Sequence, residues 1–88
     1  MKLQADEEFA RFVQRRARLN EQLDSARDEI DSWIQEHLES DVTVTELGQL
    51  EGLLKVRSDH LTELAALDDS FMIHLIELLN TQRTRGSG

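Results

Sequence analysis

The sequence has 88 residues, of which 18 are acidic and 10 are basic, so its formal net charge is −8. A chain of this length forms one small domain with little room for an enclosed pocket. Proteins bind nucleic acid backbones by neutralising phosphates with Lys and Arg, so the acidic balance argues against a nucleic-acid partner. The absence of cysteine excludes disulfides and thiolate metal sites, and we expect a cytoplasmic protein.

Helix-breaking residues are rare. Proline is absent and only four glycines occur, which predicts long uninterrupted helices. No stretch approaches the ~18 consecutive apolar residues of a bilayer-spanning helix, so we expect no membrane segment. The fold class predicted is all-α: a long antiparallel two-helix hairpin spanning residues 1–85, with residues 86–88 as a flexible tail.

A first helix is predicted over about residues 4–40. Its apolar residues recur at alternating spacings of three and four, which is the pattern of a coiled-coil seam. The seam consists of Phe9, Phe12, Arg16, Leu19, Leu23, Ala26, Ile30, Trp33 and His37.

The turn is expected at about residues 40–42. Thr43 and Glu46 have the spacing of a capping box, which starts the second helix, over about residues 43–83. So short a connection makes the helices antiparallel neighbours. Gly48 and Gly52, one turn apart, indicate either fraying near the turn or close approach of another helix.

The second helix repeats the alternation of three and four. Its predicted seam is Leu47, Leu50, Leu54, Arg57, Leu61, Leu64, Asp68, Phe71, Leu75 and Leu78. Folding at the turn places residues opposite each other when their numbers sum to 83 or 84. Phe12 then faces Phe71, and Arg16 faces Asp68 as an ion pair that specifies register more than it adds stability.

The apolar surface is wider than one seam can hide. Residues 71–79 are apolar nearly all round, which is typical of a helix covered on several sides. We therefore expect two hairpins to dimerise into a four-helix bundle. The interaction surface predicted for this contact consists of Phe71, Met72, Leu75, Ile76, Leu79, Val13, Ile34 and Leu53.

The sequence contains three histidines, a residue type that commonly binds metal ions. His60 and His74 each precede a glutamate by three residues, but di-iron bundles use the reverse order and further inward carboxylates, so no metal site is expected. Both histidines are predicted to lie beside the seam. His37, within the seam near the turn, is interpreted as a polar end to the core that can titrate near neutral pH.

One segment resembles a known enzyme family. Residues 67–83, with Asp68-Asp69 followed by Leu78-Leu79 and Arg83, are similar to the Ile-Asp-x-x-Asp…Leu-Leu…Arg opening of AroQ-type chorismate mutases, which are small helical dimers. In that family the segment opens the first helix, and cationic residues in later helices hold a dicarboxylate substrate. Here the segment ends the sequence.

The function predicted is a non-enzymatic helical interaction or oligomerisation module. No serine is paired with a base and no glycine-rich phosphate loop occurs, so no catalytic residue, cofactor or small-molecule substrate is expected. The partner is expected to be a second copy or another helix. One alternative is a small adaptor or chaperone that sheathes a client helix, and another is an AroQ-like mutase.

Overall fold

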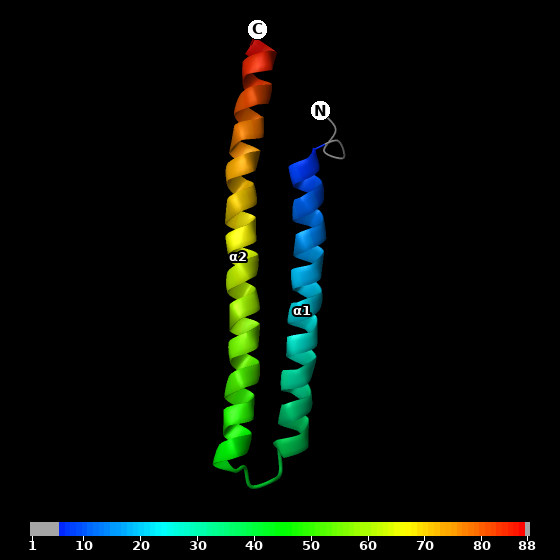
Figure 1. Ribbon diagram of the computed structural model, residues 1–88, viewed down its shortest axis with the longest axis vertical. Coiled ribbons are helices and arrows are strands. Elements are labelled where there is room, and N and C mark those ends of the chain that lie inside the picture. Colours follow the sequence, from blue (N-terminus) through cyan, green and yellow to red (C-terminus); the bar gives the residue numbers. More distant parts are fainter. Residues whose placement is uncertain (1–5, 88) are drawn as a thin grey trace.

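The protein is a helical hairpin. The computed structural model describes residues 6–87, and their side chains as far as residue 84. Helix α1 (Glu7–His37) and helix α2 (Val44–Ser87) run antiparallel, so α1 begins near the end at which α2 finishes (Figure 1). The rod measures 70 × 18 × 16 Å. Its two helices, with no strand among residues 6–87, confirm the all-α hairpin.

Helix α1 begins at a residue that caps it. The Asp6 Oδ1 atom accepts hydrogen bonds from the backbone N–H groups of Glu8 and Phe9, at 2.9 and 3.2 Å. This satisfies two of the donors that a helix start leaves unpaired. The helix ends at His37, short of the expected position near residue 40, and residues 38–43 form the connection.

Helix α2 begins with the capping box expected from the sequence. The Glu46 N–H donates to Thr43 Oγ1 at 3.2 Å, and the Thr43 N–H donates to Glu46 Oε1 at 3.1 Å. This reciprocal pair fixes the first residue of α2 at Val44. The helix continues to Ser87, so residues 86 and 87, assigned to a tail, are helical, and residue 88 lies outside the described residues.

The core is one layer thick. Only four side chains among residues 6–84 are buried, namely Leu19, Leu23, Ala26 and Ile30, and all four belong to α1. The aromatic end of the seam is formed by Phe12 and Phe71, whose rings stack at 4.1 Å. Because these two residue numbers sum to 83, the helices have the expected register.

The predicted seam of α2 is wrong at five of its ten positions: Arg57 and four leucines are exposed, whereas Asp68 is half-buried as expected. Leu50, Leu64, Phe71 and Leu78 are half-buried as expected, but Leu47, Leu54, Leu61 and Leu75 are 39–53% exposed. The half-buried residues at the alternate positions are Glu46, Leu53, His60, Leu67 and His74. Helix α2 is therefore rotated about its axis relative to the prediction. His60 and His74 lie in the seam and not beside it.

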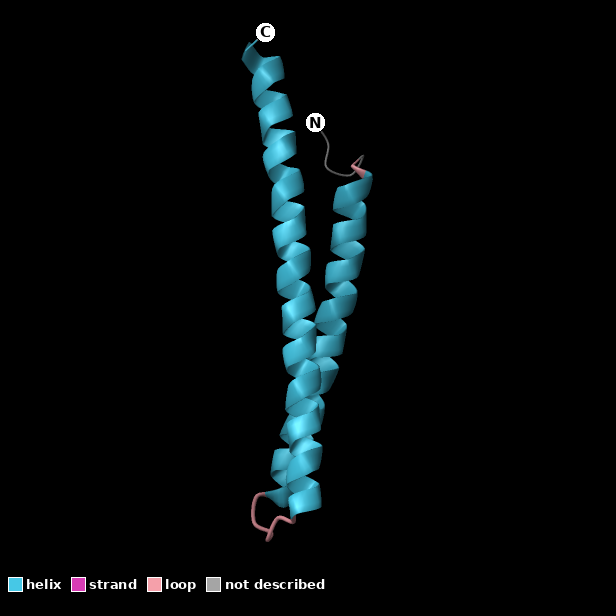
Figure 2. Ribbon diagram, turned by 60° about the vertical axis from the view of Figure 1, so that its left-hand side comes forward, coloured by secondary structure: helices cyan, strands magenta, loops and turns pink. Residues whose placement is uncertain are grey.

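The two helices differ in length. They wind about each other at a small angle (Figure 2), and α2 runs beyond the start of α1. In the observed register Asp6 is level with residue 77, so residues 78–87 extend past the capping residue of α1. No helix within residues 6–87 is long and apolar enough to cross a membrane.

Candidate interaction surface

The rotation of α2 leaves a line of large apolar side chains uncovered. Leu47, Leu54, Leu61, Met72, Leu75 and Leu79 follow one another along α2 at spacings that return to one side of a helix. Each is 39–53% exposed. The line borders the seam on one side, and it is interrupted by Asp68.

The opposite edge of the hairpin is mainly polar. Shallow grooves there are lined from α1 by Arg15, Gln22 and Glu29 and from α2 by Glu63 and Ser70. These residues recur at intervals of seven on each helix, so they mark one edge along which the two helices meet. The residues on the other side of each seam must share the second edge.

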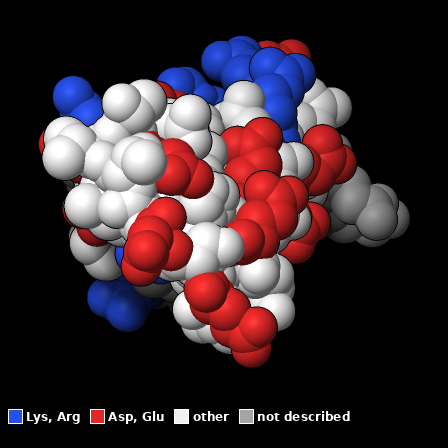
Figure 3. Space-filling view, turned by 90° about the horizontal axis from the view of Figure 1, so that it is seen from below, with Lys and Arg blue, Asp and Glu red and all other residues white. Residues whose placement is uncertain are grey.

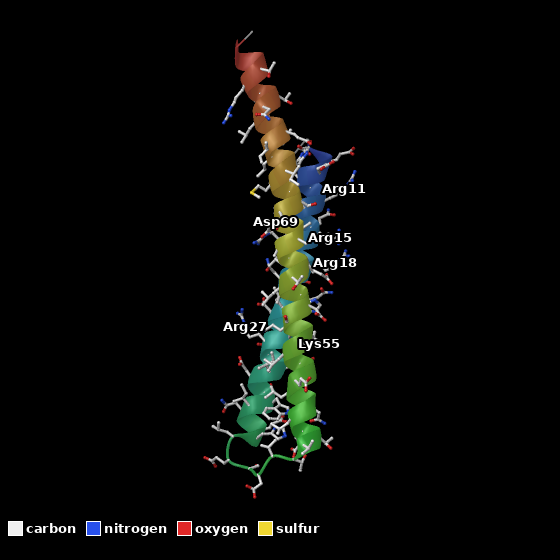
Figure 4. All side chains as sticks on the ribbon, turned by 90° about the vertical axis from the view of Figure 1, so that its left-hand side faces the viewer. Arg11, Arg15, Arg18, Arg27, Lys55 and Asp69 are labelled. Atoms are coloured by element: carbon white, nitrogen blue, oxygen red, sulfur yellow. The ribbon has the colours of Figure 1, made fainter. Side chains whose placement is uncertain are left out.

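The second edge, which we term the apolar edge, combines residues of both helices. It consists of Val13 and Ile34 of α1 and Leu47, Leu54, Leu61, Met72, Leu75 and Leu79 of α2, all at least 39% exposed. Figure 4 shows Arg11, Arg15 and Arg18 on one side of the rod and Arg27 on the other. Arg15 lines the polar edge, whereas Arg27, seven residues before Ile34, belongs to the line of α1 on the apolar edge. Single exposed apolar side chains are ordinary, but eight along one edge are typical of an interaction site.

The structure divides the predicted interaction surface. Six of its eight residues are exposed, with Val13, Ile34, Met72, Leu75 and Leu79 on the apolar edge and Ile76 nearby on α2. The other two are half-buried in the seam: Phe71, packed on Phe9 and Phe12, and Leu53. Sequence reasoning missed three members of the apolar edge, Leu47, Leu54 and Leu61, because it assigned them to the contact with α1.

The predicted register pair is brought together. Arg16 Nε donates to Asp68 Oδ1 at 3.1 Å, and Arg16 Nη2 donates to Asp68 Oδ2 at 3.4 Å. This two-point geometry is the stronger form of an Arg–carboxylate pair. Both side chains are 41–42% exposed, so solvent screens the interaction.

A histidine joins the helices at the turn end. The His37 ring stacks on Trp33 at 4.2 Å, its Nδ1 lies 2.7 Å from the Trp33 carbonyl oxygen, and its Nε2 lies 2.7 Å from Glu46 Oε2. The carbonyl and then the carboxylate of Glu46, with Glu36 nearby, favour the charged ring and raise the pKa of His37 above 6.5. Hydrogen bonds from Thr43, and then from His37, lower the pKa of Glu46.

A second histidine joins the helices at the open end of the hairpin, which is the end opposite the turn, where α1 begins. His74 Nε2 lies 3.0 Å from Asp6 Oδ2 and Nδ1 lies 3.4 Å from Glu8 Oε2. The hydrogen bond to Asp6, helped by the charges of Glu8 and Glu77, raises the pKa of His74. The same bond lowers the pKa of Asp6. At each end, therefore, a residue that caps one helix is also the carboxylate partner of a histidine from the other.

These contacts have a defined pH window. A histidine with a raised pKa stabilises the fold fully below its ordinary value of 6.5, and this contribution is lost as the pH rises through the raised value. A carboxyl with a lowered pKa stabilises the fold above its ordinary value, 3.8 for Asp6 and 4.5 for Glu46, and this contribution is lost at lower pH. The pairs of His37 with Glu46 and of His74 with Asp6 therefore both contribute fully to stability between pH 4.5 and pH 6.5.

The described residues hold no arrangement suited to metal binding. No group of three or more His, Asp or Glu side chains among residues 6–84 is placed to hold an ion. His60 lies in the seam, where its Nδ1 is buried without a hydrogen-bond partner. The segment that resembles the mutases lies on α2, where Asp68 is bound to Arg16.

Comparisons with family models, with characterised proteins and with solved structures give no match for this chain.

Proposed function

We propose that the protein is a helical self-association module in which two hairpins pack along their apolar edges to form a four-helix bundle. The observation that carries the proposal is the imbalance between a core of four buried side chains and an edge of eight exposed apolar ones. Burial of that edge removes apolar surface from water, which is the main favourable term in association.

The size of the edge suits a stable contact. Leu47 and Leu79 are 32 residues apart, so at ~1.5 Å per residue the apolar line is about 48 Å long. Over the 16 Å width of the rod this gives on the order of 800 Å² for each hairpin. Each partner in a standard specific interface contributes about the same area.

Light scattering coupled to size-exclusion chromatography tests the proposal. The wild type is expected at twice the 10.2 kDa of one chain. The double substitution Leu54→Ser and Leu61→Ser on the apolar edge is expected to shift the protein to one chain. Val56→Ser is the matched control, because Val56 is 46% exposed but lies on the polar edge, and it is expected to leave the mass unchanged.

A folded wild-type monomer at about 100 µM would contradict self-association, since standard-sized interfaces have far smaller dissociation constants. In that case the apolar edge is open to a different helix, as in the adaptor alternative. Thermal unfolding followed by circular dichroism then tests the adaptor alternative. An adaptor is expected to melt at a higher temperature when an amphipathic helical peptide is added, because the peptide binds only the folded protein.

A further inference from the structure

Charge is distributed unevenly along the rod. Residues 28–54, which form the turn end, contain eight acidic residues and no Lys or Arg, so they carry the entire net charge of −8. The remaining residues contain ten acidic and ten basic side chains. Figure 3, which looks onto the turn end, shows acidic side chains spread over it, while the blue side chains lie at its rim.

This distribution bears on how two hairpins can meet. If the turn ends lie together, two regions of net charge −8 face each other across a bundle whose neighbouring axes are about 8–10 Å apart. That separation is about one Debye length at physiological ionic strength, so the repulsion is only partly screened. If the hairpins run in opposite directions, each acidic end lies beside a region with no net charge.

The pattern of residues on the apolar edge also favours hairpins that run in opposite directions. Leu47, Leu54, Leu61, Asp68 and Leu75 are spaced by seven along one line of α2, with Leu61 at the centre. A two-fold axis at Leu61 places Leu47 opposite Leu75 and Leu61 opposite itself. It also places Asp68 opposite Leu54. When the hairpins run in the same direction, each Asp68, together with the Arg16 that binds it, lies opposite the same ion pair of the other copy, so like charges are neighbours at the interface.

We propose that two copies of this chain pack in antiparallel orientation, with the turn of each hairpin beside the open end of the other and the two-fold axis near Leu61. The inference rests on the proposed self-association. It adds the direction and the alignment of the partner, which follow from the charge distribution and from the position of Asp68.

Distances between spin labels test the orientation. The chain has no cysteine, so Ser40→Cys in the turn and Thr62→Cys near the proposed axis each create one labelling site without changing the charge. In the antiparallel dimer the two turns are separated by about 17 residues of helix on either side of the axis, so the Ser40 labels are expected about 50 Å apart. In a parallel dimer they lie within about 25 Å, a few interaxial distances.

The Thr62 labels are the control, because they lie within about 25 Å of each other in either dimer. A distance within about 25 Å between the labels at both Ser40 and Thr62 would refute the antiparallel orientation but would still support self-association. Absence of coupling at Thr62, with native helicity by circular dichroism, would refute self-association and the inference together. A short distance at Thr62 with a long one at Ser40 is the expected result.

Discussion

The pair between Arg16 and Asp68 is the contact whose energy can be separated most cleanly from packing. We expect a double-mutant cycle, Arg16→Ala and Asp68→Ala singly and together, to reveal a favourable coupling. Arg16→Ala alone also removes the aliphatic part of the side chain from the seam, so the single variants overstate the ion pair. The cycle cancels that loss.

The magnitude follows from distance and exposure. Two unit charges 3.1 Å apart attract by about 1.3 kcal/mol in water and by about 5 kcal/mol at an effective dielectric constant of about 20. Since both side chains are more than 40% exposed, solvent screening and the ordering of a long side chain reduce this to about 0.5–1 kcal/mol. In a domain of this size that coupling corresponds to roughly 2–8 °C in melting temperature.

Thermal unfolding followed by circular dichroism at fixed protein concentration measures the coupling. The pair between Arg11 and Glu7 is the control, because its atoms are 3.5 Å apart within one helix and its side chains are 74% and 87% exposed. We expect about 0.3 kcal/mol there. A coupling at Arg16 no larger than at Arg11, or one that persists unchanged in 1 M salt, would refute the reasoning.

Three further predictions concern stability. His37→Gln and His74→Gln are each expected to lower the melting temperature at pH 5.5 more than at pH 8.5, because the charged rings stabilise the hairpin only below their raised pKa values; equal losses at both pH values would contradict this. Leu23→Ala is expected to destabilise the fold by about 2–3 kcal/mol in urea unfolding, near the low end for buried leucines because the thin core lets water reach the cavity. Gly48→Ala and Gly52→Ala are each expected to raise stability by about 0.5–1 kcal/mol, since an added Cβ meets nothing within 4 Å; a loss of mass by light scattering would instead show a partner helix at that point.

The sequence was sufficient for the fold because its signals were redundant. The seam of α1, the capping box at Thr43 and the lack of helix breakers each indicate the same hairpin. The stacking of Phe12 on Phe71 shows that the register was predictable too, since a short turn leaves few ways to align two helices.

The rotation of α2 could not be predicted in the same way. Leu50, Leu64, Phe71 and Leu78 belong to two possible seams, one completed by leucines and the other by residues such as His60 and Leu67. Periodicity selects the leucines because it counts apolar residues and ignores polar contacts between helices. A signal was present, however, since the surplus of apolar residues meant that one line of them had to face away from α1.

Polar contacts at the two ends explain which seam forms. The pairs of His37 with Glu46 and of His74 with Asp6 require Glu46 and His74 to face α1. Turning α2 to bury the leucine line would move Glu46 and His74 away from α1 and so weaken both pairs. These ion pairs and the width of the apolar surface favour the observed rotation, against the cost of burying His60 Nδ1 without a hydrogen-bond partner. The contacts that fix α2 are therefore also those that expose Leu47, Leu54 and Leu61 on the apolar edge. It follows that substituting both histidines should weaken self-association as well as the hairpin, although neither histidine belongs to the proposed interface.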